Sequence, residues 1–240
     1  MGGEYSGITP ERIQELSGFI FGLALSISAL QLALSPPRYE ADFVSYAVEF
    51  SVSFVLLIGI WLSYLRVTRH LRREETSMLV VNLALLMLAT IEPYFLFVLW
   101  TGTFDNGTTA NVLDIASVAW ALDIGLMFLF LAWMTAQARR RSGVPGADRP
   151  WRDLAGLRTG IGCAMLATAV PFFWTLRYET GIVTDPVAGF PIVLHLRVLA
   201  WLPILAAAGV GSIVLGRRLD RALGDPEDPP APEEGTGGGR

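Results

Sequence analysis

The stretch that decides the fold is Arg12-Ile-Gln-Glu-Leu-Ser-Gly18, which runs directly into Phe19-Ile-Phe-Gly-Leu-Ala-Leu-Ser-Ile-Ser-Ala-Leu30. A charged and polar collar here opens an apolar run of the kind that crosses a membrane as a helix. The apolar run is interrupted by small and hydroxyl residues, namely Gly22, Ser26 and Ser28. A helix that serves only as a lipid anchor has no need of them. The stretch therefore predicts a membrane helix that either packs tightly against other helices or faces water inside a bundle.

The composition of the whole chain is that of a membrane protein. Of its 240 residues, 52% are hydrophobic and only 17% are charged, and the mean hydropathy is +0.48. A helix needs about 20 apolar residues to cross the hydrocarbon core of a bilayer. Six runs are close to this length or exceed it: 17–35, 43–65, 78–100, 112–133, 157–176 and 190–215. We therefore expect an all-α integral membrane protein with six transmembrane helices.

The basic residues, all of them arginines, indicate how the chain is oriented. They gather after the second expected span, between the fourth and fifth, and after the sixth: Arg66, Arg69, Arg72, Arg73, Arg139, Arg140, Arg141, Arg149, Arg152, Arg158, Arg217, Arg218 and Arg221. The opposite connections hold only Arg38 and Arg177. By the positive-inside rule both termini are cytoplasmic. We expect a short cytoplasmic N-terminus (1–11), a six-helix transmembrane domain (12–222) and a disordered tail (223–240) rich in Pro, Glu and Gly.

One face of the first helix collects the residues that could line a pore. At about 100° per residue, four side chains share a single arc: Leu23, Ser26, Ile27 and Leu30. On the axis of a symmetric oligomer, apolar rings would gate a pore by dewetting, and a hydroxyl ring would replace part of an ion's water. The alternative is helix packing, because Gly18, Gly22 and Ser26 are spaced by four in the small-xxx-small pattern. Periodicity by itself favours packing over a pore.

Four ionisable residues fall inside the expected spans: Glu49, Glu92, Asp123 and Arg197. Such residues are costly in a membrane and therefore mark functional sites by default. The three acids and one arginine could brace the bundle as an ion-pair cluster, form a vestibule that concentrates cations, or carry protons. The sequence leaves these three interpretations open.

Several classes of function find no support in the chain. Cys163 is the only cysteine, so no intrachain disulfide can form, and His70 and His195 are too far apart in the sequence to predict a metal site. No phosphate-binding glycine loop, nucleophile elbow or helical metalloprotease motif is present. The net charge of −4 argues against a nucleic-acid partner. We expect no enzyme activity and no cofactor.

The collar resembles a known signature. Arg12-Ile-Gln-Glu-Leu-Ser-Gly18 is similar to the Arg-x-x-x-Phe-Ser-Asp motif of the endolysosomal potassium channel family (transmembrane protein 175) and its prokaryotic relatives. Ile58-Gly-Ile-Trp61-Leu-Ser-Tyr-Leu-Arg66 resembles the end of that family's second helix, usually Trp-x-x-His, and the stretch around Asn82, followed by Pro93, resembles its third. The resemblance is best over residues 12–100. A single six-helix unit fits the prokaryotic branch, which implies a multi-pass protein of a prokaryotic cell membrane.

The resemblance implies a potassium-permeable channel, a homotetramer with the first helix lining the pore. The narrow apolar positions of the family correspond to Leu23, Ile27 and Leu30, and its hydroxyl layer corresponds to Ser26. The implied partners are further copies of the chain, membrane lipid and permeant monovalent cations, with potassium as the permeant ion and no cofactor.

The chain also departs from the family pattern. Leu16 stands in place of Phe, Gly18 in place of Asp and Tyr64 in place of His. In the family the Asp and the His, with the Arg and an Asn of the third helix, form a buried polar network that braces the pore helix. The resemblance implies that the corresponding network here comprises Arg12, Ser17, Trp61, Tyr64 and Asn82.

Two further hypotheses stand beside the channel. One is a proton- or ion-coupled small transporter that works through Glu49, Glu92 and Asp123. The other is a membrane scaffold of the same fold that does not conduct, suggested by Gly18 and Tyr64.

Overall fold

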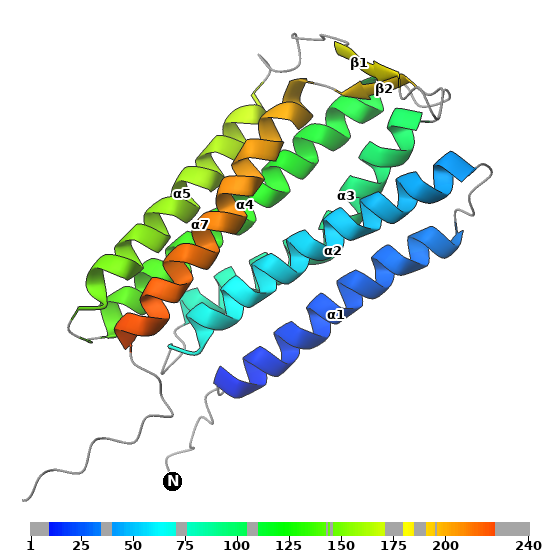
Figure 1. Cartoon of the computed structure of the whole chain (residues 1–240). Coiled ribbons are helices and arrows are strands. Elements are labelled where there is room, and N and C mark those ends of the chain that lie inside the picture. The colour runs from blue at the N-terminus through cyan, green and yellow to red at the C-terminus, as the bar shows by residue number, and fades with distance from the viewer. Residues whose placement is uncertain are drawn as a thin grey trace, which may run out of the picture.

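The computed structural model of the chain describes residues 10–34, 40–70, 76–104, 110–142, 144, 146–170, 180–184, 191–194 and 196–223. The expected segments 1–11 and 223–240 thus lie almost entirely outside the described residues. Within the described part the chain is built of helices and one short hairpin (Figure 1): α1 Pro10–Leu34, α2 Glu40–Thr68, α3 Thr76–Phe104, α4 Ala110–Ser142, α5 Asp148–Thr168, β1 Thr180–Thr184, β2 Pro191–Leu194 and α7 Leu196–Leu223.

Four of these helices are long and apolar enough to cross a membrane: Tyr46–Thr68, Ser77–Leu99, Ile115–Ser142 and Ala200–Leu223. The multi-pass helical architecture expected from the sequence is therefore observed. The expected spans 17–35 and 157–176 are not among the four. The apolar part of α1 with described side chains, Gln14–Leu30, is shorter than the length required of a span. Helix α5 begins earlier than expected and ends at Thr168, and its first half is rich in charged residues, which lowers its hydropathy.

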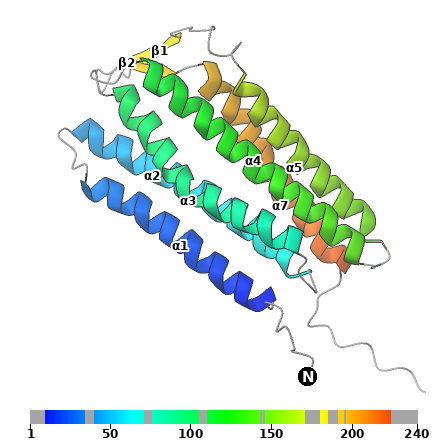
Figure 2. The same cartoon turned by 180° about the vertical axis from the view of Figure 1, so that it is seen from behind.

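The helices lie side by side in an elongated bundle (Figures 1 and 2). α1 forms one edge and packs against α2 and α3, whereas α5 and α7 lie at the opposite side and α4 packs against both α3 and α5. The start of α1 and the end of α7 lie at the same end of the bundle (Figure 1). The helices α2, α4 and α7 all end at this end of the bundle, so the arginines near their C-terminal ends lie there as well.

The core is centred on α4, which buries large apolar side chains along most of its length. Ile124, Met127 and Leu131 are fully buried. α4 and α5 approach each other closely at two glycines, since a Cβ at Gly125 would lie 3.1 Å from Gly162 O, and a Cβ at Gly162 would lie 2.9 Å from Gly125 O. Small residues at a helix contact allow the two backbones to approach in this way.

A two-stranded antiparallel sheet is the one addition to the predicted helical architecture. β1 pairs with β2, with Thr180 opposite Leu194 and Gly181 opposite Val193. The strand β2 lies inside the expected span 190–215, so the predicted start of that span is wrong, and the helix α7 begins only at Leu196. The hairpin forms at the end of the bundle where α7 begins (Figure 1).

The turn between α4 and α5 is held by charged side chains. Asp148, at the start of α5, accepts hydrogen bonds from Arg139 Nε at 2.6 Å and Arg152 Nη2 at 2.9 Å. The hydrogen bond from Arg139 is the main reason why the pKa of the Asp148 carboxyl lies below its usual value. Gly146 supplies the positive φ of 86° that the turn requires.

Candidate functional site

Helix α1 has a buried face that attaches it to the rest of the chain. Ser17, Phe21, Ala24 and Ser28 are buried, and they follow one another at intervals of three or four residues. The Phe21 ring lies 6.4 Å from the ring of Tyr64 on α2, centroid to centroid. This face packs against α2 and α3 and fixes which side of α1 turns outward.

The opposite face of α1 carries the predicted pore residues. Leu23 is 47% exposed and Leu30 is 55% exposed, Ser26 is exposed as well, and Ile27 is half-buried at the edge of this face. Ser26 Oγ donates a hydrogen bond to the Gly22 carbonyl oxygen at 2.8 Å. Because the hydroxyl proton is used inside the helix, the oxygen lone pairs remain free to accept from water or to contact a cation.

The small residues of α1 do not produce close helix packing within the described part of the chain. A Cβ built at Gly18 or Gly22 would meet no described atom within 4 Å. This contrasts with Gly125 and Gly162, where α4 and α5 nearly touch. Gly18 and Gly22, whose spacing by four suggested close packing, therefore have no second helix packed closely against them within the described residues.

Of the predicted bracing residues, Ser17 lies on the buried face of α1, whereas Trp61, Tyr64 and Asn82 lie on α2 and α3, the helices against which that face packs. Ser17 is buried, and its hydroxyl donates to the Gln14 carbonyl oxygen of its own helix at 2.7 Å. Tyr64 is fully buried beside Phe21. Trp61 Nε1 and Asn82 Oδ1 are buried and have no hydrogen-bond partner among the described residues. The side chain of Arg12 lies outside the described set.

A polar contact that the sequence did not single out joins α1 to α2. Gln14 Nε2 donates to Thr68 Oγ1 at 3.3 Å, close to the end of α2. Gln14 lies within the collar, where its polar character gave no sign of a specific partner.

Three helices bring the predicted acids into the interior of the bundle. Glu49 on α2, Glu92 on α3 and Asp123 on α4 are all buried, with Glu92 fully so. Glu92 interacts electrostatically with both of the other acids. Its two carboxylate oxygens accept hydrogen bonds from Ser53 Oγ at 2.7 Å and Trp120 Nε1 at 3.2 Å. Glu92 is thus the centre of the cluster.

The other two acids have fewer hydrogen-bond partners among the described residues. Glu49 Oε2 and both oxygens of Asp123 have no hydrogen-bond partner among the described residues. Arg197, the expected counter-charge, is the second residue of α7, but its side chain lies outside the described set. No group of three or more His, Cys, Asp and Glu among the described residues is arranged to hold a metal ion.

The two residues that donate hydrogen bonds to Glu92, Ser53 and Trp120, were not predicted from the sequence. Ser53 and Trp120 are uncharged, so no argument from charge could select them. Ser53 follows Glu49 by four residues and Trp120 precedes Asp123 by three, so helical spacing places each beside an acid. Trp120 also packs on Trp201 of α7 at 4.5 Å between ring centroids.

Arg158 occupies a different place from the one that its sequence context suggested. In the sequence it belongs to the arginines between the fourth and fifth expected spans, but in the structure it is completely buried between α5, α4 and α2. Its guanidinium donates to Thr135 Oγ1 and, at 3.4 Å, to the Ser63 carbonyl oxygen. Spacing offered a signal, because Arg158 shares one face of α5 with the buried Leu154 and Ile161.

Comparison with known proteins gives one match. The model of the family described as Endosomal/lysosomal potassium channel TMEM175 matches residues 12–93. The match spans most of α1, all of α2 and α3 as far as Pro93, and it confirms the resemblance found in the sequence over these residues, about a third of the chain. The comparisons with curated proteins and with solved structures found no match.

Proposed function

We propose that this protein is a membrane cation channel, permeable to potassium, that conducts through a pore lined by α1 at the axis of a homotetramer. The observation that carries the proposal is the outward face of α1, on which Leu23, Ser26 and Leu30 are exposed while the opposite face is buried. The family that matches residues 12–93 is one of potassium channels rather than enzymes.

In this proposal the pore works through alternating apolar and hydroxyl rings. Leu23, Ile27 and Leu30 of the four copies form narrow rings that pass ions only when they are wetted. Ser26 lies between them and offers an oxygen whose own proton is already donated to Gly22. A potassium ion that sheds part of its water can then contact a ring of hydroxyl oxygens, without a filter built from backbone carbonyls.

The proposed orientation follows from the arginines. Both termini face the cytoplasm of a prokaryotic cell, since the arginine-rich helix ends, the start of α1 and the end of α7 lie at one end of the bundle (Figure 1). The gap left by Gly18, where the family signature has Asp, is compatible with this arrangement because Ser17 and Phe21 still attach α1 to the bundle.

The test compares two leucines of equal exposure. Leu23 on α1 is 47% exposed and Leu83 on α3 is 48% exposed. In liposomes that contain the purified protein, Leu23→Ser should raise potassium flux severalfold because it wets an apolar ring, whereas Leu83→Ser should leave the flux unchanged. Equal fluxes for the two variants and the parent protein would remove α1 from the pore.

The buried acids favour a second candidate, a proton- or ion-coupled small transporter that uses Glu49, Glu92 and Asp123. Its specific support is the buried Asp123 carboxylate, whose oxygens have no hydrogen-bond partner among the described residues. In the same liposomes, transport that depends on a pH gradient and is abolished by Asp123→Asn would favour the transporter. A potassium flux that persists in Asp123→Asn and needs no gradient of protons would favour the channel.

A further inference from the structure

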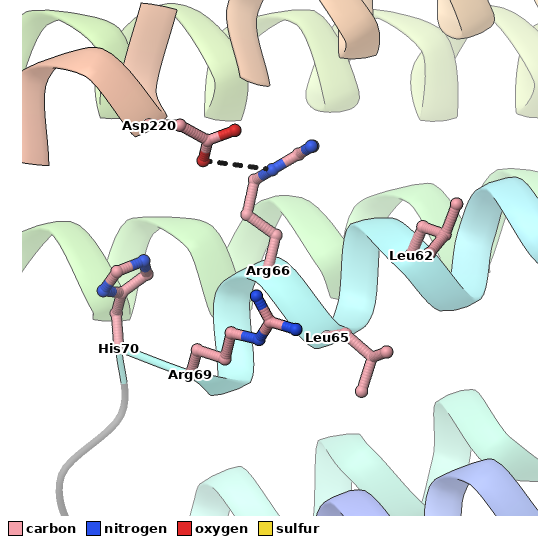
Figure 3. Close-up of a pocket in the computed structure, with 6 residues that line it drawn as sticks. All are labelled: Leu62, Leu65, Arg66, Arg69, His70 and Asp220. Carbon is pink, nitrogen blue, oxygen red and sulfur yellow. Dashed lines mark ion pairs between the residues drawn. The ribbon is translucent and has the colours of Figure 1, made fainter. Parts of the chain in front are cut away.

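A pocket lies between the end of α2 and the end of α7, at the arginine-rich end of the bundle. It has a volume of about 240 Å³ and is lined by Leu62, Leu65, Arg66, Arg69, His70 and Asp220 (Figure 3). All but Asp220 come from α2 or the turn that follows it. In Figure 3, Arg66 extends from α2 toward Asp220 on α7, whereas Arg69 and His70 lie at the end of α2.

The lining changes from apolar to cationic along the axis of α2, from Leu62 to Arg69. Leu62, which is 52% exposed, precedes Arg66 by four residues on the same face of α2 and so lies about 6 Å deeper along the helix. The part of α2 that is long and apolar enough to span a membrane ends at Thr68, and Arg69 and His70 follow it directly. The pocket therefore lies at the depth at which a lipid's acyl chains give way to its phosphate.

The pocket carries an excess of positive charge. Arg66 Nε lies 3.5 Å from Asp220 Oδ1, an ion pair in which both side chains remain partly exposed. Arg69 is exposed and forms no ion pair with any described residue. The described residues that line the pocket thus hold two guanidinium groups and one carboxylate, and among them one positive charge remains for an anionic ligand.

The guanidinium of Arg66, which extends from α2, packs closely against Gly216 of α7. A Cβ at Gly216 would lie 2.5 Å from Arg66 Nη1, so the absence of a side chain at Gly216 makes room for the arginine. On the other side of the pocket, the His70 ring stands edge-on to the buried Trp151 at 5.5 Å between centroids. Two of the lining residues are therefore held by defined contacts, Arg66 with α7 and His70 with Trp151 of α5.

We propose that this pocket binds the phosphate group of an anionic membrane lipid. Arg69, with Arg66 beside it, contacts the phosphate oxygens, because guanidinium groups match the geometry of a phosphate. Leu62 and Leu65 contact the glycerol and the first methylenes of the acyl chains. A free phosphate ion would contact the arginines, but it would make no contact with the exposed side chain of Leu62. Basic pockets between the ends of membrane helices bind anionic headgroups by the same chemistry.

The test uses native mass spectrometry of the full-length protein in detergent, titrated with phosphatidylglycerol or with phosphatidylcholine. The parent protein should retain phosphatidylglycerol in preference, and Arg69→Gln should weaken its retention about fivefold. Asp220→Asn should strengthen retention, because it removes the carboxylate found among the described residues that line the pocket. A misfolded protein could not show this gain. The matched control is Arg140→Gln, which removes an exposed arginine from α4 and should leave retention unchanged.

Two outcomes would overturn the proposal. If Arg69→Gln and Arg140→Gln weaken retention equally, anionic lipid is attracted by the diffuse charge of this end of the protein. If sodium phosphate displaces the lipid and Leu62→Ser leaves lipid retention unchanged, the pocket is a site for free phosphate. Loss of phosphatidylglycerol in Leu62→Ser, with inorganic phosphate unable to compete, supports the lipid. None of these outcomes depends on whether the protein conducts potassium.

Discussion

The contact between α4 and α5 predicts that Gly162→Ala yields a less stable protein than Gly160→Ala, an alanine substitution elsewhere on the same helix. A Cβ at Gly162 would lie 2.8 Å from Leu129 Cδ2 and 2.9 Å from the Gly125 carbonyl oxygen. The leucine can move away by rotating its side chain. The carbonyl oxygen belongs to the backbone of α4, so the two helices must separate by about half an ångström to restore ordinary contact at 3.4 Å.

The size of the effect follows from two opposing terms. Forcing a methyl group into a packed contact costs about 1–3 kcal/mol, since neighbouring groups lose part of their dispersion contacts. Alanine in place of glycine within a helix returns about 1 kcal/mol. Gly160→Ala supplies the control, because Gly160 lies on the same helix, is exposed, and a Cβ there meets no described atom within 4 Å. The difference between the variants therefore isolates the steric cost.

The assay is unfolding of the purified protein in detergent micelles by increasing proportions of sodium dodecyl sulfate, followed by circular dichroism. We expect the free energy of unfolding of Gly162→Ala to lie about 1–3 kcal/mol below that of Gly160→Ala. Equal stabilities would show that α4 and α5 do not approach at Gly125, and the close packing of these two helices would have to be abandoned.

The same assay checks two more predictions. Ser53→Ala should lower the free energy of unfolding by about 1–3 kcal/mol, because it removes a hydrogen bond to the buried Glu92; the exposed Ser51→Ala, which loses only a bond to its own helix, should change it by less than about 0.5 kcal/mol. Burial lowers the pKa of His70, despite the opposing charge of Asp220, so the folded protein takes up this proton less readily than the unfolded chain. Stability should therefore fall as the pH drops through about 6.5, and His70→Gln should reduce that fall; an unchanged pH dependence in His70→Gln would contradict the assignment.

The helices could be predicted from the sequence because their cause is local. Runs of apolar residues about 20 long form membrane helices whatever their neighbours are, and the expected runs correspond to α1 to α4 and α7 with shifted ends. The spacing of Leu23, Ser26, Ile27 and Leu30 also placed these residues on one face of α1, although periodicity by itself favoured packing there. The bounds of α5 were predicted less well. Its first half is charged and does not look like a membrane span, yet it is helical and buries Trp151 and Arg158 against other helices.

The contacts between helices could not be predicted in the same way. The sequence selected Glu49, Glu92 and Asp123 because charge inside a span is rare, and all three are buried together. It gave no means of choosing Ser53 and Trp120 as the groups that satisfy Glu92, because serine and tryptophan are common in membrane helices. The choice depends on how α2, α3 and α4 are rotated, and this rotation is set by packing along their whole length.

The nature of the outward face of α1 becomes clearer when it is compared with that of α3. The exposed face of α3 is built of large apolar side chains, among them Val80, Leu83 and Met87, which suits contact with lipid tails. The exposed face of α1 interrupts its leucines with Gly22 and the hydroxyl of Ser26. Lipid gains little from such positions, whereas a narrow aqueous path or a second copy of the helix can use them. The two faces are equally uncovered in one chain, so their different chemistry is the reason to expect that α1 rather than α3 lies at an interface between copies.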